Sequence, residues 1–372
     1  MKFCVNLNEL TEAIAVVTKA LSPNVENNIL KGIYFSSYGN ELFLKCSDSA
    51  VQIETLIPAL IEDEGAAVLP GRLTADLIRK LKGEKVDFEL DPSSNTMKVA
   101  SKKGNFSLQY FDAGLYPQMD DLAGDVSFKM KQGVFRSMIK QTVFCCASDD
   151  EGKAILRGVF MEFTDEGMLN LVALDGFRLA KRTEKVSVKG NARNAVVPAR
   201  AMQYISNTLT DGEDEVTVTL SQTHITVNMG STRIKARLIK GEYINYNNIL
   251  SKKSTSRVTA IRSELVDSLE IASLFSRDTQ NNLVKFDFEG NKMNISARSE
   301  SGSIRESAEI SITGTPIEIA FNSKYMLDII KAIEDESVAL SFNTSVTPCV
   351  VEPVQGSSFY YLVLPVRLMR NW

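Results

Sequence analysis

The chain has 372 residues and a formal net charge of −4, with 44% hydrophobic and 24% charged residues. These values are ordinary for a folded protein and argue against disorder, collagen or a coiled coil over the whole chain. The longest apolar run, from Phe359 to Val366, is far shorter than the roughly 18 residues needed to cross a bilayer, and the N-terminus lacks an apolar signal region. We therefore expect a cytoplasmic protein of two or three domains.

Cysteine and histidine content narrows the possible chemistry. The five cysteines form no CxxC pair and are typical of buried thiols in a reducing compartment. The single histidine, His224, excludes multi-histidine metal sites and lies in a strand-like alternation. No phosphate-binding loop, dinucleotide fingerprint or nucleophile elbow is present, and the carboxylate pairs Asp120-Asp121 and Asp149-Asp150 lie in polar stretches. These observations favour a binding protein without a cofactor or metal over an enzyme.

The predicted elements of the first 125 residues begin with a helix. Asn6 precedes Glu9 by three residues, which is a helix-start pattern, and apolar residues from Leu10 to Leu21 follow at helical spacing. An apolar strand then ends at Pro70 and leads into a second helix that carries Arg72. The alternation Phe106-x-Leu108-x-Tyr110 predicts a later strand.

The same succession recurs twice more along the chain. Pro198 and Asn322 occupy the position of Pro70, and Arg200 and Lys324 occupy that of Arg72. Opening helices are marked by Phe135, Ile139, Val143 and Cys146 in the second copy and by Leu265, Leu269 and Ala272 in the third. Such periodicity predicts three repeats, 1–125, 126–255 and 256–372, each with two helices and several antiparallel strands in an α+β fold.

Charge is unevenly distributed among these repeats, at −6, +6 and −4. Basic residues lie on the predicted helices. If the helices line one surface, they would attract phosphates without reading sequence. From composition alone, ordinary solvated helix faces are the simpler explanation. The candidate phosphate-facing residues, which would face DNA if the chain binds it, are Arg72, Arg79, Lys80, Arg136, Lys140, Arg200 and Lys324.

Four motifs in order resemble the bacterial β sliding clamp family, the DNA polymerase III β subunit. Leu174 to Ala180 resembles its TDGHRLA stretch, and Ala195 to Arg200 its VIVPRK stretch. Phe321 to Asp328 is similar to its FNxxYLLD motif, and Tyr361 to Leu368 to its YVVMPMRL ending. The resemblance covers the whole chain.

The resemblance implies three sliding-clamp domains and a head-to-tail homodimeric ring of six domains around double-stranded DNA. It implies a processivity factor in DNA replication rather than an enzyme. The partners it implies are the DNA polymerase III alpha subunit, a clamp loader and other clamp-motif replication and repair proteins. Each partner would dock a short apolar peptide between the second and third domains.

Two sets of residues are implied by matching positions. The dimer interface would contain Lys102, Lys103, Phe106, Leu108, Leu274, Phe275, Glu300 and Glu306, with Glu309 nearby. The peptide pocket would contain Leu156, Leu174, Gly176, Phe177, Arg178, Leu179, Ile244, Ile249, Asn322, Tyr325, Met326, Val346, Val363, Leu364, Pro365, Val366, Arg367 and Leu368.

The chain also departs from the family pattern. Leu174 and Phe177 stand where the family has Thr and His, and the loop from Tyr243 to Ile249 lacks the usual proline and arginines. Asn24 stands where a DNA-contacting arginine is expected, and the chain continues past the usual end through Met369 to Trp372.

Two other functional classes remain open from the residues alone. One is a monomeric scaffold of three repeats with no role on DNA. The other is a nuclease that uses clustered carboxylates and Mg²⁺.

Overall fold

The computed structural model describes residues 1–21, 26–119, 124–148, 152–250, 254–277 and 280–368. Packing divides the chain into two compact units. Unit 1 contains residues 1–136, 187–192 and 204–238, and unit 2 contains 137–186, 193–203 and 239–372. This division passes through the predicted second repeat, so the domain limits near residues 125 and 255 stay predictions.

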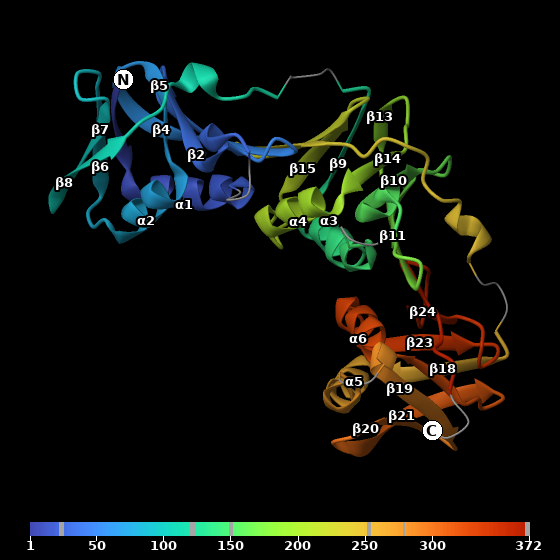
Figure 1. Cartoon of the computed structure of the whole chain (residues 1–372). Coiled ribbons are helices and arrows are strands. Elements are labelled where there is room, and N and C mark those ends of the chain that lie inside the picture. Colours follow the sequence, from blue (N-terminus) through green and yellow to red (C-terminus); the bar gives the residue numbers. More distant parts are fainter. Residues whose placement is uncertain (22–25, 120–123, 149–151, 251–253, 278–279, 369–372) are drawn as a thin grey trace. The chain divides into compact units, whose positions relative to one another are not determined.

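Each predicted repeat supplies two of the six α-helices found in the described residues (Figure 1). The helices are α1 (Leu7–Val17), α2 (Gly71–Lys80), α3 (Gln132–Lys140), α4 (Ala199–Thr208), α5 (Arg262–Ser276) and α6 (Ser323–Ala332). Helix α1 packs on α2, and α5 packs on α6.

Unit 1 is built on one antiparallel sheet of 13 strands among the described residues. Its main path runs β13-β9-β15-β16-β17-β4-β1-β6-β7-β8, with β2, β3 and β5 branching from it. The strands are β1 (Lys2–Asn6), β2 (Gly32–Tyr38), β3 (Glu41–Ser47), β4 (Val51–Asp63), β5 (Gly65–Pro70), β6 (Lys85–Asp91), β7 (Thr96–Ser101), β8 (Gly104–Gln109), β9 (Val126–Lys131), β13 (Val188–Gly190), β15 (Glu215–Leu220), β16 (His224–Met229) and β17 (Thr232–Arg237).

Unit 2 contains a second antiparallel sheet, of 12 strands among the described residues, in the order β14-β10-β11-β12-β25-β24-β23-β18-β21-β20-β19-β22. The strands are β10 (Gly158–Phe163), β11 (Met168–Leu174), β12 (Arg178–Lys185), β14 (Ala195–Pro198), β18 (Ser256–Ile261), β19 (Leu283–Glu289), β20 (Lys292–Ser299), β21 (Gly302–Gly314), β22 (Ile319–Asn322), β23 (Ser337–Phe342), β24 (Cys349–Pro353) and β25 (Phe359–Val363).

The helix start predicted at Asn6 is confirmed, and the apolar faces predicted for α1 and α5 are buried, although α1 ends at Val17, before Leu21. The Asn6 side chain accepts hydrogen bonds from the backbone N–H groups of Asn8 and Glu9, which caps α1. Leu10 is fully buried, and the predicted third-repeat face of α5 is buried as well. Such amphipathic helices gain most of their stability by packing this face on the sheet.

Helix α3 is shorter than its apolar spacing predicts, because it ends at Lys140, before Val143 and Cys146. The cause lies at Thr142. Its hydroxyl donates a hydrogen bond to the carbonyl of Met138, the acceptor that its own backbone N–H would use in a continuing α-helix. The backbone N–H donates instead to the carbonyl of Ile139, three residues back. This tighter bonding closes the helix, and a 3₁₀ turn follows.

Strands from successive repeats pair with one another within each unit. In unit 1, β17 of the second repeat pairs with the first half of β4 of the first repeat. In unit 2, β25 of the third repeat pairs with β12 of the second. We call β4 and β12 accepting strands, because the last strand of the next repeat pairs with them, and we call β17 and β25 joining strands. The chain therefore uses the same pairing between repeats twice.

Lys45 lies almost fully buried in unit 1, with its ammonium group 4.5 Å from the ring centre of Tyr34 and 5.2 Å from that of Tyr116. Its Nζ donates to Gln118 at 2.6 Å. Burial lowers the pKa of Lys45 to about 8. Between that value and the unfolded pKa of 10.5, the unfolded chain binds the extra proton, so the stability of the fold rises with pH in this window.

We expect Lys45→Met to be more stable than the parent at pH 7, by up to about 3 kcal/mol. The difference should shrink as the pH rises from 8 to 10.5. In this range Lys45 loses its charge in the folded parent, so the cost of burying that charge disappears and the parent becomes more stable. Urea unfolding of both proteins across this range measures it. A difference that does not change with pH would contradict the account.

No helix in the described part of the chain is long and apolar enough to cross a membrane. Within the same residues, no group of three or more His, Cys, Asp and Glu side chains is placed to hold a metal ion. His224 lies in strand β16, as its alternation predicts.

Candidate functional site

The turn between β11 and β12 in unit 2 presents an aromatic side chain to solvent. The Asp175 carboxylate accepts the backbone N–H groups of Phe177 at 2.9 Å and Arg178 at 3.0 Å. Gly176 has a φ of 97°, a conformation that favours glycine. The turn leaves Phe177 54% exposed, whereas Leu174 before it and Arg178 after it are buried.

The buried arginine at this turn links the second and third repeats. Its Nε donates to Asp175 at 3.0 Å, and its Nη1 donates to Asp328 on α6 at 2.7 Å. Its Nη2 donates to the carbonyl of Phe144 at 2.9 Å. Burial works to lower the pKa of Arg178, but the hydrogen bonds to Asp328 and Asp175 help to raise it overall. The guanidinium group is therefore fixed by three acceptors.

Aromatic and aliphatic side chains adjoin this arginine. The guanidinium carbon of Arg178 lies 4.4 Å from the ring centre of Tyr325, and the rings of Tyr325 and Phe177 are 6.0 Å apart. The backbone N–H of Leu364 donates to the carbonyl of Phe177 at 2.9 Å. Leu364 is 39% exposed. Phe177, Tyr325 and Leu364, which we call the aromatic site, thus form an accessible apolar surface on the paired repeats.

The remaining predicted pocket residues separate into a buried set and an accessible set. The buried side chains cannot touch a docked peptide directly; they support the surface, and they are Leu156, Leu174, Leu179, Met326 and Val363. Ile249, Val346 and Arg367 are exposed, and Ile244, Asn322, Pro365, Val366 and Leu368 are half-buried. Asn322 caps α6 by accepting the N–H groups of Lys324 and Tyr325.

The loop that departs from the family pattern is anchored by tyrosines. The Tyr243 ring stacks on Phe160 at 4.7 Å between ring centres, and the Tyr246 hydroxyl donates to the Glu162 carboxylate. Ile244 packs against the cluster that contains Leu156, Leu174 and Leu179. Aromatic packing therefore holds the loop that carries Ile244 and Ile249.

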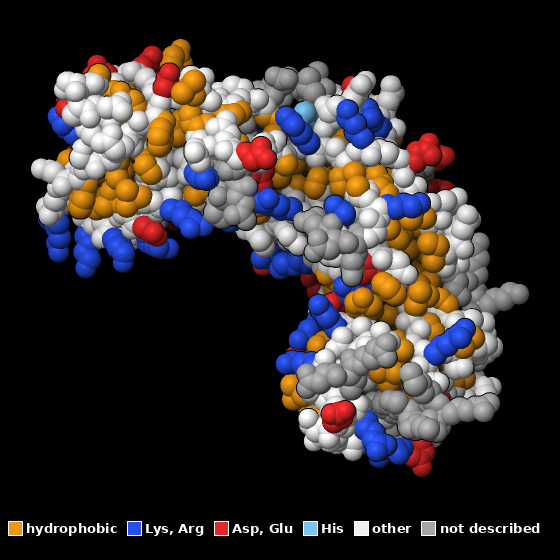
Figure 2. All heavy atoms as spheres, viewed as in Figure 1, with side chains coloured by type: hydrophobic (Ala, Val, Ile, Leu, Met, Phe, Trp, Pro, Cys, Tyr) orange, Lys and Arg blue, Asp and Glu red, His pale blue; other side chains and the backbone are white. Residues whose placement is uncertain are grey.

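The basic residues of the helices differ in how available they are. In unit 1, Arg72 and Lys80 are exposed, and Arg79 pairs with Asp76 one turn away. Arg136 is largely covered and pairs with Asp211, so it is less available to a phosphate. Figure 2 shows lysine and arginine side chains gathered along the edge of unit 1 that α1 and α2 occupy. In unit 2, Lys140, Arg200 and Lys324 are exposed.

Strands β8 and β21 each have an edge, or part of one, with no hydrogen-bonded neighbour among the described strands. β8 ends the sheet of unit 1, pairing only with β7 among the described strands. The first half of β21 pairs only with β20, because β18 takes its second half. By their order in the repeats, β8 corresponds to β17 and β25, and β21 to β4 and β12. The joining strand of the first repeat and the accepting strand of the third are thus both unused.

The predicted interface residues lie at these two edges. Phe106 on β8 is 38% exposed, whereas Leu108 is buried. Lys102 and Lys103 are exposed in the turn that leads into β8. In the third repeat, Leu274 is 58% exposed, and the ring of Phe275 lies against Gly302 at the start of β21. Glu300 is exposed and Glu306 is half-buried on the same edge.

Two contributors were missed by the sequence-based choice of site residues. Asp328 and the Phe144 carbonyl both hold Arg178. Asp328 lies within the motif that begins at Phe321, so the sequence could have marked it as a candidate. Only the fold shows that its partner is Arg178. Several predictions fall outside the described residues, namely those on Asn24, on Asp120-Asp121 and Asp149-Asp150, and on Met369 to Trp372.

Comparison with known proteins covers nearly all of the chain. Models of the N-terminal, central and C-terminal domains of the DNA polymerase III beta subunit match residues 1–120, 129–245 and 247–367. The beta sliding clamp of Staphylococcus aureus is 27% identical over 377 residues, covering 99% of each chain.

Solved structures agree with these matches. The DNA polymerase sliding clamp of Bacillus subtilis superposes with a TM-score of 0.94 at 27% identity, over 99% of this chain and 100% of that one. The beta subunit from the DNA polymerase of Streptococcus pyogenes gives a TM-score of 0.93 at 26% identity with the same coverage.

Proposed function

The chain belongs to the DNA polymerase III beta subunit family, the beta sliding clamps, and from this premise we propose that two copies close head to tail into a ring around duplex DNA. It is a processivity factor with three sliding-clamp domains and no catalytic role of its own. The observation that carries the ring is the pair of unused strand edges, β8 and β21.

Ring closure follows from repeating the pairing already present in the chain. β17 on β4 joins the first two repeats, and β25 on β12 joins the last two. In the same way, β8 of one protomer would pair with β21 of the next, and two protomers would give six equivalent junctions. Phe106 and Leu274 would then be covered. Because the pairing is antiparallel, Lys102 and Lys103 at the start of β8 would lie near Glu306 and Glu309 of β21. Opposite charges at the rim would select the head-to-tail register.

The DNA contact in this proposal is electrostatic and independent of sequence. Exposed Arg72, Lys80, Arg200 and Lys324 would attract phosphates, and Arg136 would contribute less because Asp211 already pairs with it. Such contacts position DNA without reading its bases, which permits sliding. Net acidity would limit binding to nucleic acid outside the ring.

Partner proteins are proposed to dock at the aromatic site with a short peptide that carries leucine and phenylalanine. The DNA polymerase III alpha subunit, the clamp loader and other clamp-motif proteins would share it, and the protein would act in the cytoplasm. Exposed Phe177 and Leu364 offer apolar contacts, and Tyr325 is held in place beneath Arg178. Rigid aromatic and aliphatic anchors of this kind dominate binding energies.

Fluorescence polarisation with a labelled Gln-Leu-Asp-Leu-Phe peptide tests this docking. We expect Phe177→Ala and Leu364→Asp each to weaken binding at least tenfold, roughly the effect of removing one central contact. Tyr38→Ala is the matched control, because Tyr38 is a highly exposed aromatic residue in unit 1. Equal binding by the parent and both site variants would rule out the aromatic site.

The two other classes are less well supported. A monomeric scaffold would leave the edges of β8 and β21 open, a state that proteins usually avoid. A Mg²⁺-dependent nuclease conflicts with membership of a family of non-catalytic processivity subunits.

A further inference from the structure

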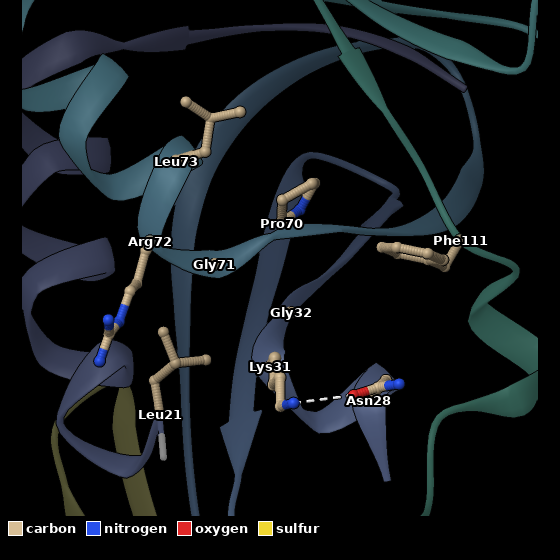
Figure 3. A pocket seen from close by; sticks show the side chains of 9 residues that line it. All are labelled: Leu21, Asn28, Lys31, Gly32, Pro70, Gly71, Arg72, Leu73 and Phe111. Atoms are coloured by element: carbon tan, nitrogen blue, oxygen red, sulfur yellow. Dashed lines mark hydrogen bonds between the residues drawn. The ribbon is translucent and has the colours of Figure 1, made fainter. Parts of the chain in front are cut away.

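A pocket in unit 1 lies apart from the aromatic site and the two open strand edges, and Arg72 is the one DNA-facing candidate among its described lining residues. It opens between the start of α2 and the segment that follows β8, and its volume is about 580 Å³. Leu21, Pro70, Leu73 and Phe111 supply apolar walls (Figure 3). Leu73 is 57% exposed and Phe111 is 49% exposed, so two large apolar side chains face solvent here. This size is typical of cavities that bind small ligands or peptide side chains.

The pocket is a counterpart, within the first repeat, of the aromatic site region in the third. Strand β5 leads into α2 as β22 leads into α6, so Pro70 corresponds to Asn322 and Leu73 to Tyr325. After the last strand of each of these repeats, the chain runs back beside the strand that leads into the second helix. Phe111 pairs with Val68 on β5, and the N–H of Val366 donates to Ala320 on β22.

Charge distinguishes this pocket from its counterpart. Lys31 and Arg72 line it, and none of its described lining residues is acidic. The Lys31 ammonium donates to the neutral Asn28 side chain at 2.8 Å, which leaves its charge uncompensated by that contact. Figure 3 shows the Lys31 side chain directed toward Asn28, with the hydrogen bond between them dashed. Two cations beside apolar walls complement a ligand that carries both an apolar side chain and a carboxylate.

The local backbone strengthens this preference. At Gly71 an added Cβ would lie 2.6 Å from the Lys31 carbonyl, so glycine allows α2 to begin against the backbone of Lys31. That close approach brings the two cations to one pocket. Asn322 caps α6 with its side chain, whereas Pro70 has no side-chain acceptor for the first N–H groups of α2. A carboxylate in the pocket would find the positive end of the helix as well.

We propose that this pocket is a second peptide-docking site, which takes a short extended peptide of a partner protein with a large apolar residue next to a carboxylate. The apolar side chain would lie against Pro70, Leu73 and Phe111, and the carboxylate near Lys31 and Arg72. This inference rests in part on the proposed function, because the correspondence is to the proposed peptide site of the third repeat.

The test uses the full-length Leu364→Asp protein, in which binding at the aromatic site is weakened, and a fluorescein-labelled Gly-Ser-Leu-Phe peptide with a free terminal carboxylate. We expect saturable binding that remains in this background. Adding Leu73→Glu should abolish it, and adding Phe111→Ser should weaken it at least tenfold. Adding Lys82→Glu should not change it, since Lys82 is exposed just after the same helix but does not line the pocket. The C-terminal amide of the peptide should bind about tenfold more weakly.

Two results would overturn the second site. One is the loss of all saturable binding up to about 1 mM in Leu364→Asp while the parent still binds, which would leave the proposed function intact. The other is equal weakening by Leu73→Glu and Lys82→Glu, which would show general charge repulsion. If instead binding in the parent is lost with Leu73→Glu and unaffected by Leu364→Asp, the second site stands and the aromatic site fails.

Discussion

Replacing the buried arginine of unit 2, Arg178→Ala, should lower the free energy of unfolding by about 3 to 5 kcal/mol, the usual cost of removing one partner of a buried ion pair. Asp175 and Asp328 would lose the cation that joins them, and the Phe144 carbonyl would lose its donor. Denaturant unfolding followed by far-ultraviolet circular dichroism measures the loss. Peptide binding should fall as well, because Tyr325 loses the guanidinium group that packs on its ring.

Two variants sharpen this expectation. Arg178→Lys keeps the charge but lacks the planar fork, so it should recover only part of the lost stability. Arg367→Ala removes an exposed arginine from the same unit and should change stability by less than about 0.5 kcal/mol. An Arg178→Ala protein as stable as Arg367→Ala would mean that the three contacts of Arg178 contribute nothing net.

The second large effect concerns the open edge of β8. Phe106→Asp should raise the dissociation constant of the dimer at least about 30-fold, as expected for a central apolar contact. The variant should still fold, because Phe106 is 38% exposed in a single protomer. The same change at Leu108 is unsuitable, since Leu108 is buried and a carboxylate there would disrupt the protomer itself. Sedimentation velocity over a range of concentrations gives the dissociation constant.

The control for the edge is Tyr38→Asp, which places the same charge on a residue 75% exposed in unit 1. It should leave the dimer unchanged. A Phe106→Asp protein that sediments as the parent does would exclude β8 from the interface and, with it, closure of the ring through β8 and β21.

Local patterns predicted much of the fold because they depend on neighbouring residues. The cap of Asn6 on α1 involves groups within three residues, and the strand at His224 follows from alternation alone. The end of α3 was missed because the Thr142 hydroxyl competes for a helical carbonyl, which apolar spacing does not reveal.

The site was harder to predict because its contacts are distant in sequence. Arg178 and Asp328 lie 150 positions apart, and no periodicity connects them. The resemblance supplied the neighbourhood of Phe177 and Leu364, but it could not separate exposed residues from buried support such as Met326. The pocket beside Phe111 was not predicted, since it becomes visible only when β5 and the segment after β8 come together.

Retention on DNA of different topology tests the central claim most directly. The protein is loaded by its clamp loader and ATP onto nicked circular DNA, and half of the sample is then linearised before gel filtration at physiological salt. A ring that encircles DNA should stay with the circle and be lost from the linear form by sliding off its ends. Equal retention on both forms would indicate ordinary phosphate binding, and would contradict the ring.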